Sequence, residues 1–126
     1  MKELFVKLKE AECDVEGALA RFLDDEELYE QFYGELLNDE AFGKLGLALE
    51  ERRISDAFEY AHTLKGIIGN MGLTPMFNIV CDIVEPLRIN SFDGVKENYE
   101  ELLANLRSYY GMDGTMMEGY WSWLSK

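Results

Sequence analysis

The stretch "ISDAFEYAHTLKGIIGNMG", residues 54–72, sets the pattern for most of the chain. Its apolar residues recur every three or four positions, the period of an amphipathic helix, and Gly72 is placed to end that helix as a left-handed residue. At 100° per residue one sector should face the core, and it contains Ile54, Ala57, Ala61, Leu64, Ile68 and Met71. The single histidine, His62, lies roughly 130° from the centre of that sector. We therefore predict a helix that buries one face and projects His62 into solvent.

Two glycines interrupt this helix on the same outer strip as His62. Gly66 and Gly69 each cost about 1 kcal/mol relative to alanine in a helix interior, so a packing or functional reason is expected for both. The strip also carries Ser55, Phe58 and Lys65. Gly69 could equally serve close helix packing, and Phe58 could belong to the rim of the core. The strip as a whole predicts a surface that another molecule can approach closely.

The helical period continues along most of the chain, without the period-2 pattern of strands. We predict main helices at about 24–51 with a break near 38–39, at 54–71, at 74–86 and at 95–110, after short pieces at 4–8 and 14–22. Asp14 and Asp24 are the predicted N-caps of the early segments. Thr74 and Pro75 should begin the third main helix, and Pro86 should end or kink it. The pattern predicts an all-α, antiparallel four-helix bundle with a short additional N-terminal helix or helices.

Length and composition restrict the classes of protein to consider. A chain of 126 residues, 48% of them hydrophobic, is expected to form a single domain over 1–126, with a bundle core at about 14–110. The tail at 111–126 should pack on the bundle or extend from it, and its Trp121 and Trp123 could cover the bundle end or form a second interaction patch. We expect a monomer.

Charge and apolar patterning disfavour several partners. The formal net charge of −13 repels nucleic acid and anionic lipid, so neither is expected as a partner. The N-terminal stretch has no apolar leader, and no segment approaches the roughly 18 apolar residues of a membrane span, which predicts a cytoplasmic protein. Cys13 and Cys81 lack a metal-ligand spacing, which predicts reduced thiols and no metal site.

An exposed imidazole beside a cation and bare backbone suits attack on a phosphoryl group. Neutral imidazole is a nucleophile, and an ordinary pKa near 6.5 leaves much of it unprotonated at neutral pH. Lys65, three residues after His62, can offset the charge of the transferred oxygens. A lone surface histidine usually has no function, and a lone lysine is usually only solvated. The combination of His62, Lys65 and Gly66 favours the functional interpretation.

At these residues the chain resembles a known family. "AHTLKGIIGNMG", residues 61–72, is similar to the signature of histidine-containing phosphotransfer (HPt) domains, where the phosphorylated histidine is followed by Lys at +3, Gly at +4 and a glycine at the helix end. The resemblance runs from about residue 14, with the lead-in "DVEGALARFLDDEELYEQF", to about residue 110. It implies a phosphoprotein of two-component signal transduction, a phosphocarrier without ATP-dependent kinase activity of its own.

The resemblance also implies roles for individual residues. His62 would be the phosphoacceptor, Lys65 the phosphate-stabilising cation and Gly66 the residue that gives steric access. Family members often place a polar amide on the following helix near the histidine, whereas this chain has Val84 near that place, with Asn78 or Asp82 as possible replacements. The implied receiver-docking strip consists of Ser55, Phe58 and Gly69.

Three functions follow from these observations. The first is a phosphorelay intermediate that accepts and donates a phosphoryl group between His62 and the aspartate of receiver domains. Its partners would be a response-regulator receiver domain, a hybrid histidine kinase, or both, and the receiver would supply Mg²⁺ because the chain has no cofactor of its own. The second is a non-phosphorylated adaptor or inhibitor that binds a receiver or kinase through the same face. The third, a kinase or hydrolase, is the weakest because Walker and kinase motifs are absent.

The strongly acidic composition raises a question about docking. A receiver gathers carboxylates to hold Mg²⁺, so a protein of charge −13 would repel it unless local cations or apolar contacts compensate. Lys65, Arg52 and Arg53 are the basic residues that the sequence suggests as local anchors.

Overall fold

Short turns divide the chain into helices of limited length. The computed structural model describes residues 2–112 and has seven α-helices there. In chain order they are α1 (Glu3–Glu10), α2 (Val15–Arg21), α3 (Glu26–Leu37), α4 (Ala41–Glu50), α5 (Ile54–Asn70), α6 (Thr74–Arg88) and α7 (Val95–Tyr109). No strand occurs in residues 2–112, and the predicted all-α class is confirmed. Residues 113–126, which include Trp121 and Trp123 of the predicted tail, lie outside the described part of the chain.

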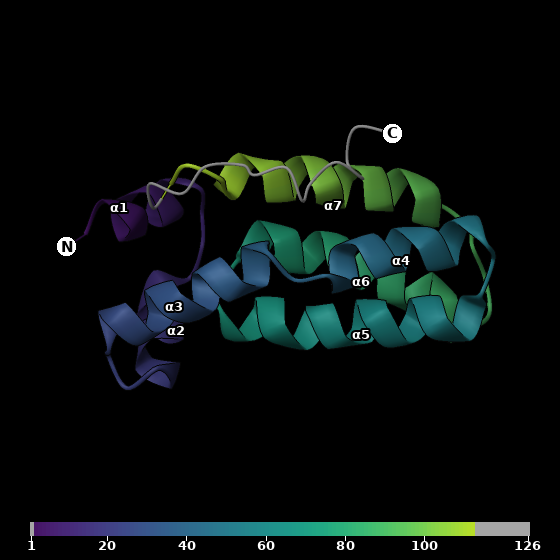
Figure 1. The fold of residues 1–126 in the computed structure, drawn as a ribbon. Helices are drawn as coiled ribbons and strands as arrows, with labels where there is room; N and C mark the ends of the chain where they lie inside the picture. The colour runs from purple at the N-terminus through teal and green to yellow at the C-terminus, as the bar shows by residue number, and fades with distance from the viewer. Residues whose placement is uncertain (1, 113–126) are drawn as a thin grey trace.

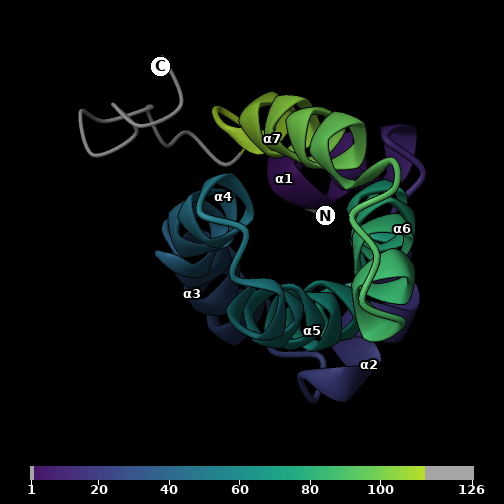
Figure 2. The same cartoon turned by 90° about the vertical axis from the view of Figure 1, so that its right-hand side faces the viewer.

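Four helices surround a common core. Figure 2 shows α4, α5, α6 and α7 arranged as a ring, with α5 between α4 and α6, and with α6 between α5 and α7. The three earlier helices gather at one end of this group, where α5 ends and α6 begins (Figure 1). This arrangement brings residues near position 20 close to the last turn of α5.

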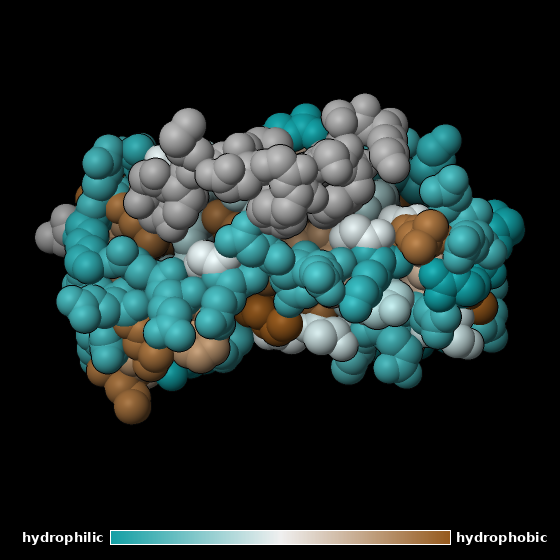
Figure 3. Space-filling view, in the orientation of Figure 1, coloured by the Kyte–Doolittle hydropathy of each residue, from teal (hydrophilic) through white to brown (hydrophobic). Residues whose placement is uncertain are grey.

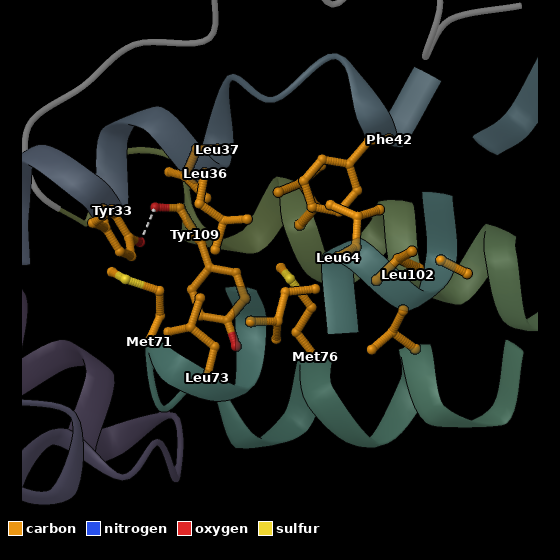
Figure 4. Packing of buried hydrophobic residues seen from close by; sticks show 14 of the residues in the cluster. Tyr33, Leu36, Leu37, Phe42, Leu64, Met71, Leu73, Met76, Leu102 and Tyr109 are labelled. Atoms are coloured by element: carbon orange, nitrogen blue, oxygen red, sulfur yellow. Dashed lines mark hydrogen bonds between the residues drawn. The ribbon is translucent and has the colours of Figure 1, made fainter. Parts of the chain in front are cut away.

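The core is built from large apolar side chains contributed by each of the four helices. Phe42 from α4, Leu64 from α5 and Leu102 from α7 are fully buried and lie close together, with Met76 from α6 beside them (Figure 4). At the end near α3, the hydroxyl of the buried Tyr33 donates a hydrogen bond to the carbonyl of Tyr109 at 3.0 Å. No polar or charged residue is fully buried among those described. Burial of apolar surface therefore dominates the stability of the bundle.

The face of the molecule seen in Figure 3 is largely hydrophilic. Charged and polar side chains make up most of the coloured surface in this view, and the apolar patches are separate from one another. No helix among residues 2–112 combines the length and the apolar character needed to cross a membrane.

The early helix boundaries follow side-chain caps. The carboxylate of Asp14 accepts a hydrogen bond from the Gly17 N–H at 3.1 Å, so the predicted cap of α2 is confirmed. The predicted cap Asp24 is wrong by one residue, because Asp25 accepts the Leu28 N–H at 3.0 Å. Asp24 has a φ of 58° and donates its own N–H to Leu19 at 2.7 Å, which closes the end of α2.

The break predicted near residues 38–39 is confirmed. α3 ends at Leu37 and α4 begins at Ala41, whose N–H donates to the carboxylate of Asp39 at 2.8 Å. The segment predicted as one interrupted helix is therefore two separate helices.

The predicted N-cap of α6 is wrong, and of the two effects predicted for Pro86 the ending of the helix does not occur. Its N-cap is Leu73, and Thr74 is already helical, with its hydroxyl donating to the Gly72 carbonyl at 3.4 Å. The helix also continues past Pro86 to Arg88. Proline has no N–H for the carbonyl four residues earlier, that of Asp82, and the side-chain amide of Asn98 on α7 donates to this carbonyl at 3.3 Å. This replacement donor removes one cost of a proline inside the helix.

Candidate functional site

The histidine lies on the solvent-facing side of α5, as the helical periodicity predicts. Ala57, Ala61, Leu64 and Ile68 are fully buried, whereas His62 is exposed. Among residues 2–112 the His62 ring has no hydrogen bond or ion pair. Both ring nitrogens are therefore available to an incoming group.

The imidazole is supported on one side by an aromatic ring. Phe58, one turn earlier on α5, stacks against His62 with ring centroids 5.5 Å apart and an interplanar angle of 24°. The guanidinium of Arg88, from α6, lies over the same Phe58 ring at 5.3 Å from its centroid. Phe58 is half-buried and packs against the edge of the core. It therefore contacts both the core and the imidazole, and it restricts the orientation of the histidine ring.

Lys65 is the nearest cation along the helix. Its side chain is half-buried and forms no ion pair or hydrogen bond with any residue in the described part of the chain. Most of the other lysines in residues 2–112 are paired with glutamates, as Lys2, Lys7, Lys9 and Lys44 show. The charge of Lys65 is thus not neutralised by any neighbour among residues 2–112.

The two glycines of the strip have different surroundings. A methyl group placed on Gly66 would meet no packed neighbour within 4 Å, so nothing inside the described protein requires a glycine there. A methyl group on Gly69 would lie 2.9 Å from a ring carbon of Phe77 on α6. Gly69 therefore allows α6 to pack closely against α5. Gly66 has no such packing role among the described residues.

A shallow hollow adjoins the histidine on its C-terminal side. It has a volume of about 430 Å³ and is lined by Arg21, His62, Lys65, Gly66, Gly69, Asn70 and Phe77. Glycine backbone from α5 forms part of its lining, and two basic side chains contribute to it. Such a hollow can accommodate a group brought by another molecule.

Three residues of the hollow, Arg21, Asn70 and Phe77, were not predicted from the sequence. Arg21, the last residue of α2, donates from Nε to the Asn70 carbonyl at 3.0 Å and from Nη2 to the Gly69 carbonyl at 3.1 Å. Phe77 reaches the hollow because Gly69 allows α6 to pack closely against α5. Only the spacing "IIGNMG" hinted at a close helix contact, and no local signal pointed to Arg21.

Other predicted residues lie outside the hollow. Ser55 is exposed seven residues before His62, about 10 Å away along the helix axis. Val84 is fully buried, and Asn78 and Asp82 are exposed. None of these three from α6 lines the hollow, and among residues 2–112 neither Asn78 nor Asp82 forms a hydrogen bond with His62.

A larger hollow, of about 1110 Å³, lies elsewhere, between α4 and α7. Its lining includes Leu47, Phe92, Tyr99 and Leu103 and no histidine or cysteine. Within residues 2–112, no group of three or more potential metal-ligating side chains lies together. The chemistry available at His62 is accordingly that of an imidazole nucleophile with adjacent cations.

This helical bundle with an outward histidine belongs to a recognised class of signalling domain. The sequence model of the Hpt domain matches residues 27–109, about two thirds of the chain, and the chain belongs to the Hpt domain family. No curated protein and no solved structure matches the chain. Family membership indicates involvement in histidine phosphotransfer in phosphorelays, through interaction with receiver domains or histidine kinases. Domains of this family are phosphocarriers rather than kinases.

Proposed function

We propose that this protein is a phosphorelay intermediate in which His62 accepts a phosphoryl group from the aspartyl phosphate of one receiver domain and donates it to another. The observation that carries the proposal is the exposed His62 beside Gly66, a glycine that no packing contact among residues 2–112 explains. A methyl-free surface at that position lets the partner's carboxylate reach the imidazole in line with the phosphorus.

The transfer is a single exchange of bonds at phosphorus. A ring nitrogen of neutral His62 attacks the phosphorus, the N–P bond forms, and the bond to the aspartate oxygen breaks. The carboxylate leaves with the bonding electrons, and the imidazole proton is lost to solvent. Donation to the next receiver reverses these steps. Phosphoryl transfer of this kind depends on positioning and on neutralising charge on the equatorial oxygens.

The chain's own residues have distinct roles in this proposal. Phe58 restricts the imidazole plane through its stacking contact, and Lys65 offers an unpaired ammonium to the phosphoryl oxygens. Mg²⁺ belongs to the receiver, whose carboxylates hold it. The partner therefore brings the acceptor carboxylate and the metal, and this protein brings the nucleophile and an ammonium.

The test is phosphoryl uptake from a receiver domain phosphorylated with radiolabelled acetyl phosphate. We expect an acid-labile, base-stable label on the wild-type protein, and His62→Gln should abolish it. Because the chain has one histidine, any phosphohistidine must be at position 62. Thr63→Gln, at the neighbouring exposed position, is the matched control and should still take up label.

The adaptor function gives a different result in the same experiment. An adaptor would bind the receiver equally well with glutamine at position 62 and would never acquire the label. That outcome, or uptake of label by His62→Gln, would overturn the phosphorelay assignment.

A further inference from the structure

Arg21 occupies a position that family membership does not explain. It belongs to α2, ahead of the segment 27–109 that matches the family. Its two hydrogen bonds hold the guanidinium at the last carbonyls of α5, the helix that carries His62. Arg21 is exposed and lines the same hollow as His62 and Lys65. A residue 41 positions before the histidine thus contributes to the surface around it.

The guanidinium retains the capacity to bind an anion. Nε and Nη2 donate to the α5 carbonyls, and Nη1 has no hydrogen bond to any residue described. Arg21 forms no ion pair with a carboxylate in residues 2–112, although acidic residues outnumber basic ones by 25 to 12 in the chain. The planar guanidinium fork suits bidentate binding of a carboxylate, and its two anchoring bonds reduce the entropy lost on binding.

Two of the three basic residues that the sequence suggests as anchors, Arg52 and Arg53, are engaged elsewhere. Arg53 is held by Glu51 at 2.9 Å and by Asp56 at 2.5 Å. Arg52 lies over the ring of Phe92, with its guanidinium carbon 4.3 Å from the centroid. Both precede α5, whereas the hollow lies on the C-terminal side of His62. Lys65 and Arg21 are the basic side chains that line the hollow.

We propose that Arg21 anchors a carboxylate on the receiver-domain partner and so sets the docking of that partner at the His62 hollow. The inference rests on the proposed function for the identity of the partner, but it concerns association and not the transfer of the phosphoryl group. A strongly acidic protein needs local cations to receive a partner rich in carboxylates. Arg21 provides a second cation in addition to Lys65, and it extends the proposed contact surface to α2.

A simpler role for Arg21 is to cap the C-terminal end of α5, where cations interact favourably with the helix dipole. Arg21→Gln removes the charge on which both roles depend, so the measurement separates them: loss of the cap lowers the free energy of unfolding, and loss of the anchor weakens binding of the receiver. Arg107→Gln is the matched control, since it removes one positive charge from an exposed arginine on α7 that does not line the hollow. Arg21→Lys keeps the charge and loses the fork.

The experiment measures binding and transfer with the receiver domain that transfers fastest in a screen of receiver domains from the source genome. Binding of the unphosphorylated receiver is measured by calorimetry between 25 and about 500 mM salt, the range over which screening becomes strong. We expect Arg21→Gln to weaken binding roughly three- to tenfold at low salt, with the difference shrinking at high salt. Arg107→Gln should stay within about twofold of wild type. Maximal transfer at saturating receiver should be unchanged in both.

Two other outcomes would overturn the proposal that Arg21 anchors the receiver. Equal binding by Arg21→Gln and Arg107→Gln at every salt concentration would leave Arg21 as a helix cap. A loss of maximal transfer with unchanged binding would place Arg21 in the transfer step instead. If thermal unfolding shows that Arg21→Gln is not folded, Arg21→Lys replaces it. We expect Arg21→Lys to bind the receiver more weakly than wild type, by up to about threefold, because it keeps the charge and loses the guanidinium fork. Failure of the proposed function is separate, because it shows as absence of label on His62 whatever Arg21 does.

Discussion

At the scale of single residues, Gly66 and Gly69 separate two reasons for glycine within one helix. They are three positions apart on α5, so they lie on the same face. Gly69 is required by the ring of Phe77, whereas Gly66 borders open space. An interior glycine with no packing reason is a cost to stability that only an interaction with another molecule offsets.

Alanine at each position should therefore give opposite patterns. Gly66→Ala should raise the free energy of unfolding by about 1 kcal/mol through helix propensity and lower the transfer rate roughly ten- to a hundredfold by displacing the partner. Gly69→Ala should be less stable than Gly66→Ala, because the new methyl group must move Phe77. Urea unfolding and the transfer assay measure both quantities.

Phe77→Ala provides the control for the packing argument. In that background Gly69→Ala no longer meets the ring, so its cost should largely disappear in a double-mutant cycle. Full transfer activity in a stabilised Gly66→Ala protein would contradict the role given to Gly66.

The sequence predicts the residues of the site that share one helix. The outward position of His62 and the neighbouring places of Lys65 and Gly66 follow from 100° per residue, which is a local rule. Arg21 and Phe77 reach the hollow from α2 and α6, and their positions depend on how helices pack. No periodicity in a single sequence encodes that packing.

At the scale of the helices, the C-terminal end of α5 is the junction that positions the hollow. Gly72 has a φ of 73°, and Leu73 N–H donates to the Ile68 carbonyl at 3.3 Å, which closes the helix as predicted. The carbonyl of Gly72 also accepts the Asp14 N–H at 2.8 Å. The end of α5 is thereby joined to the start of α2, the helix that carries Arg21.

Gly72→Ala should disrupt this junction. A methyl group there would overlap the Asp14 carbonyl oxygen, and the left-handed backbone would be an additional cost for alanine. We expect a loss of about 2–4 kcal/mol in the free energy of unfolding, from roughly 1–2 for the backbone and the rest for the overlap. Denaturant unfolding checks the value.

Gly94→Ala isolates the backbone part of that loss. Gly94 has a φ of 72°, and a methyl group on it would come no closer than 3.8 Å to a packed neighbour, the Asn98 amide nitrogen. It should cost only about 1–2 kcal/mol. Equal losses for the two variants would show that the contact between Gly72 and Asp14 contributes nothing.

The remaining boundaries show where local rules compete. Pro86 alone indicates a helix end, yet Asn98 from α7 supplies a donor that the local sequence around Pro86 does not contain. Asp24 and Asp25 are both acceptable caps, and closure of α2 by the Asp24 N–H leaves Asp25 for α3. Such choices are made by neighbouring elements, which explains the errors of one or two residues.

At the scale of the whole molecule, tyrosine hydroxyls link helices that are distant in the sequence. Tyr29 donates to the Met71 carbonyl at 2.7 Å, and Tyr99 donates to the Phe42 carbonyl at 2.8 Å. Burial raises the pKa of both phenols, and also that of Tyr109, above the ordinary value. An ionised phenol could not donate these bonds, and the folded state therefore holds the protons more tightly than the unfolded state.

The bundle should consequently lose stability in base. An unfolded tyrosine has a pKa of about 10, so below about pH 9 both states are protonated and the full stability is present. As the pH rises through 10, the unfolded state releases protons first and becomes favoured. Three such phenols should lower the free energy of unfolding by on the order of 2 kcal/mol between pH 8 and pH 10.5. Urea unfolding at the two pH values measures the difference.

Tyr29→Phe tests whether the buried phenols cause this dependence. The variant loses the hydrogen bond to Met71 and so is less stable at pH 8, but one proton-holding group is also gone. Its decline between pH 8 and pH 10.5 should therefore be smaller than that of the wild type by about a third. Part of the phenolate absorbance should appear only on unfolding, because burial raises the pKa of Tyr29, Tyr99 and Tyr109 and delays their ionisation in the folded state. Equal stability at both pH values, or an unchanged decline in Tyr29→Phe, would mean that these hydroxyls ionise freely in the folded bundle and that other groups hold the helices together in base.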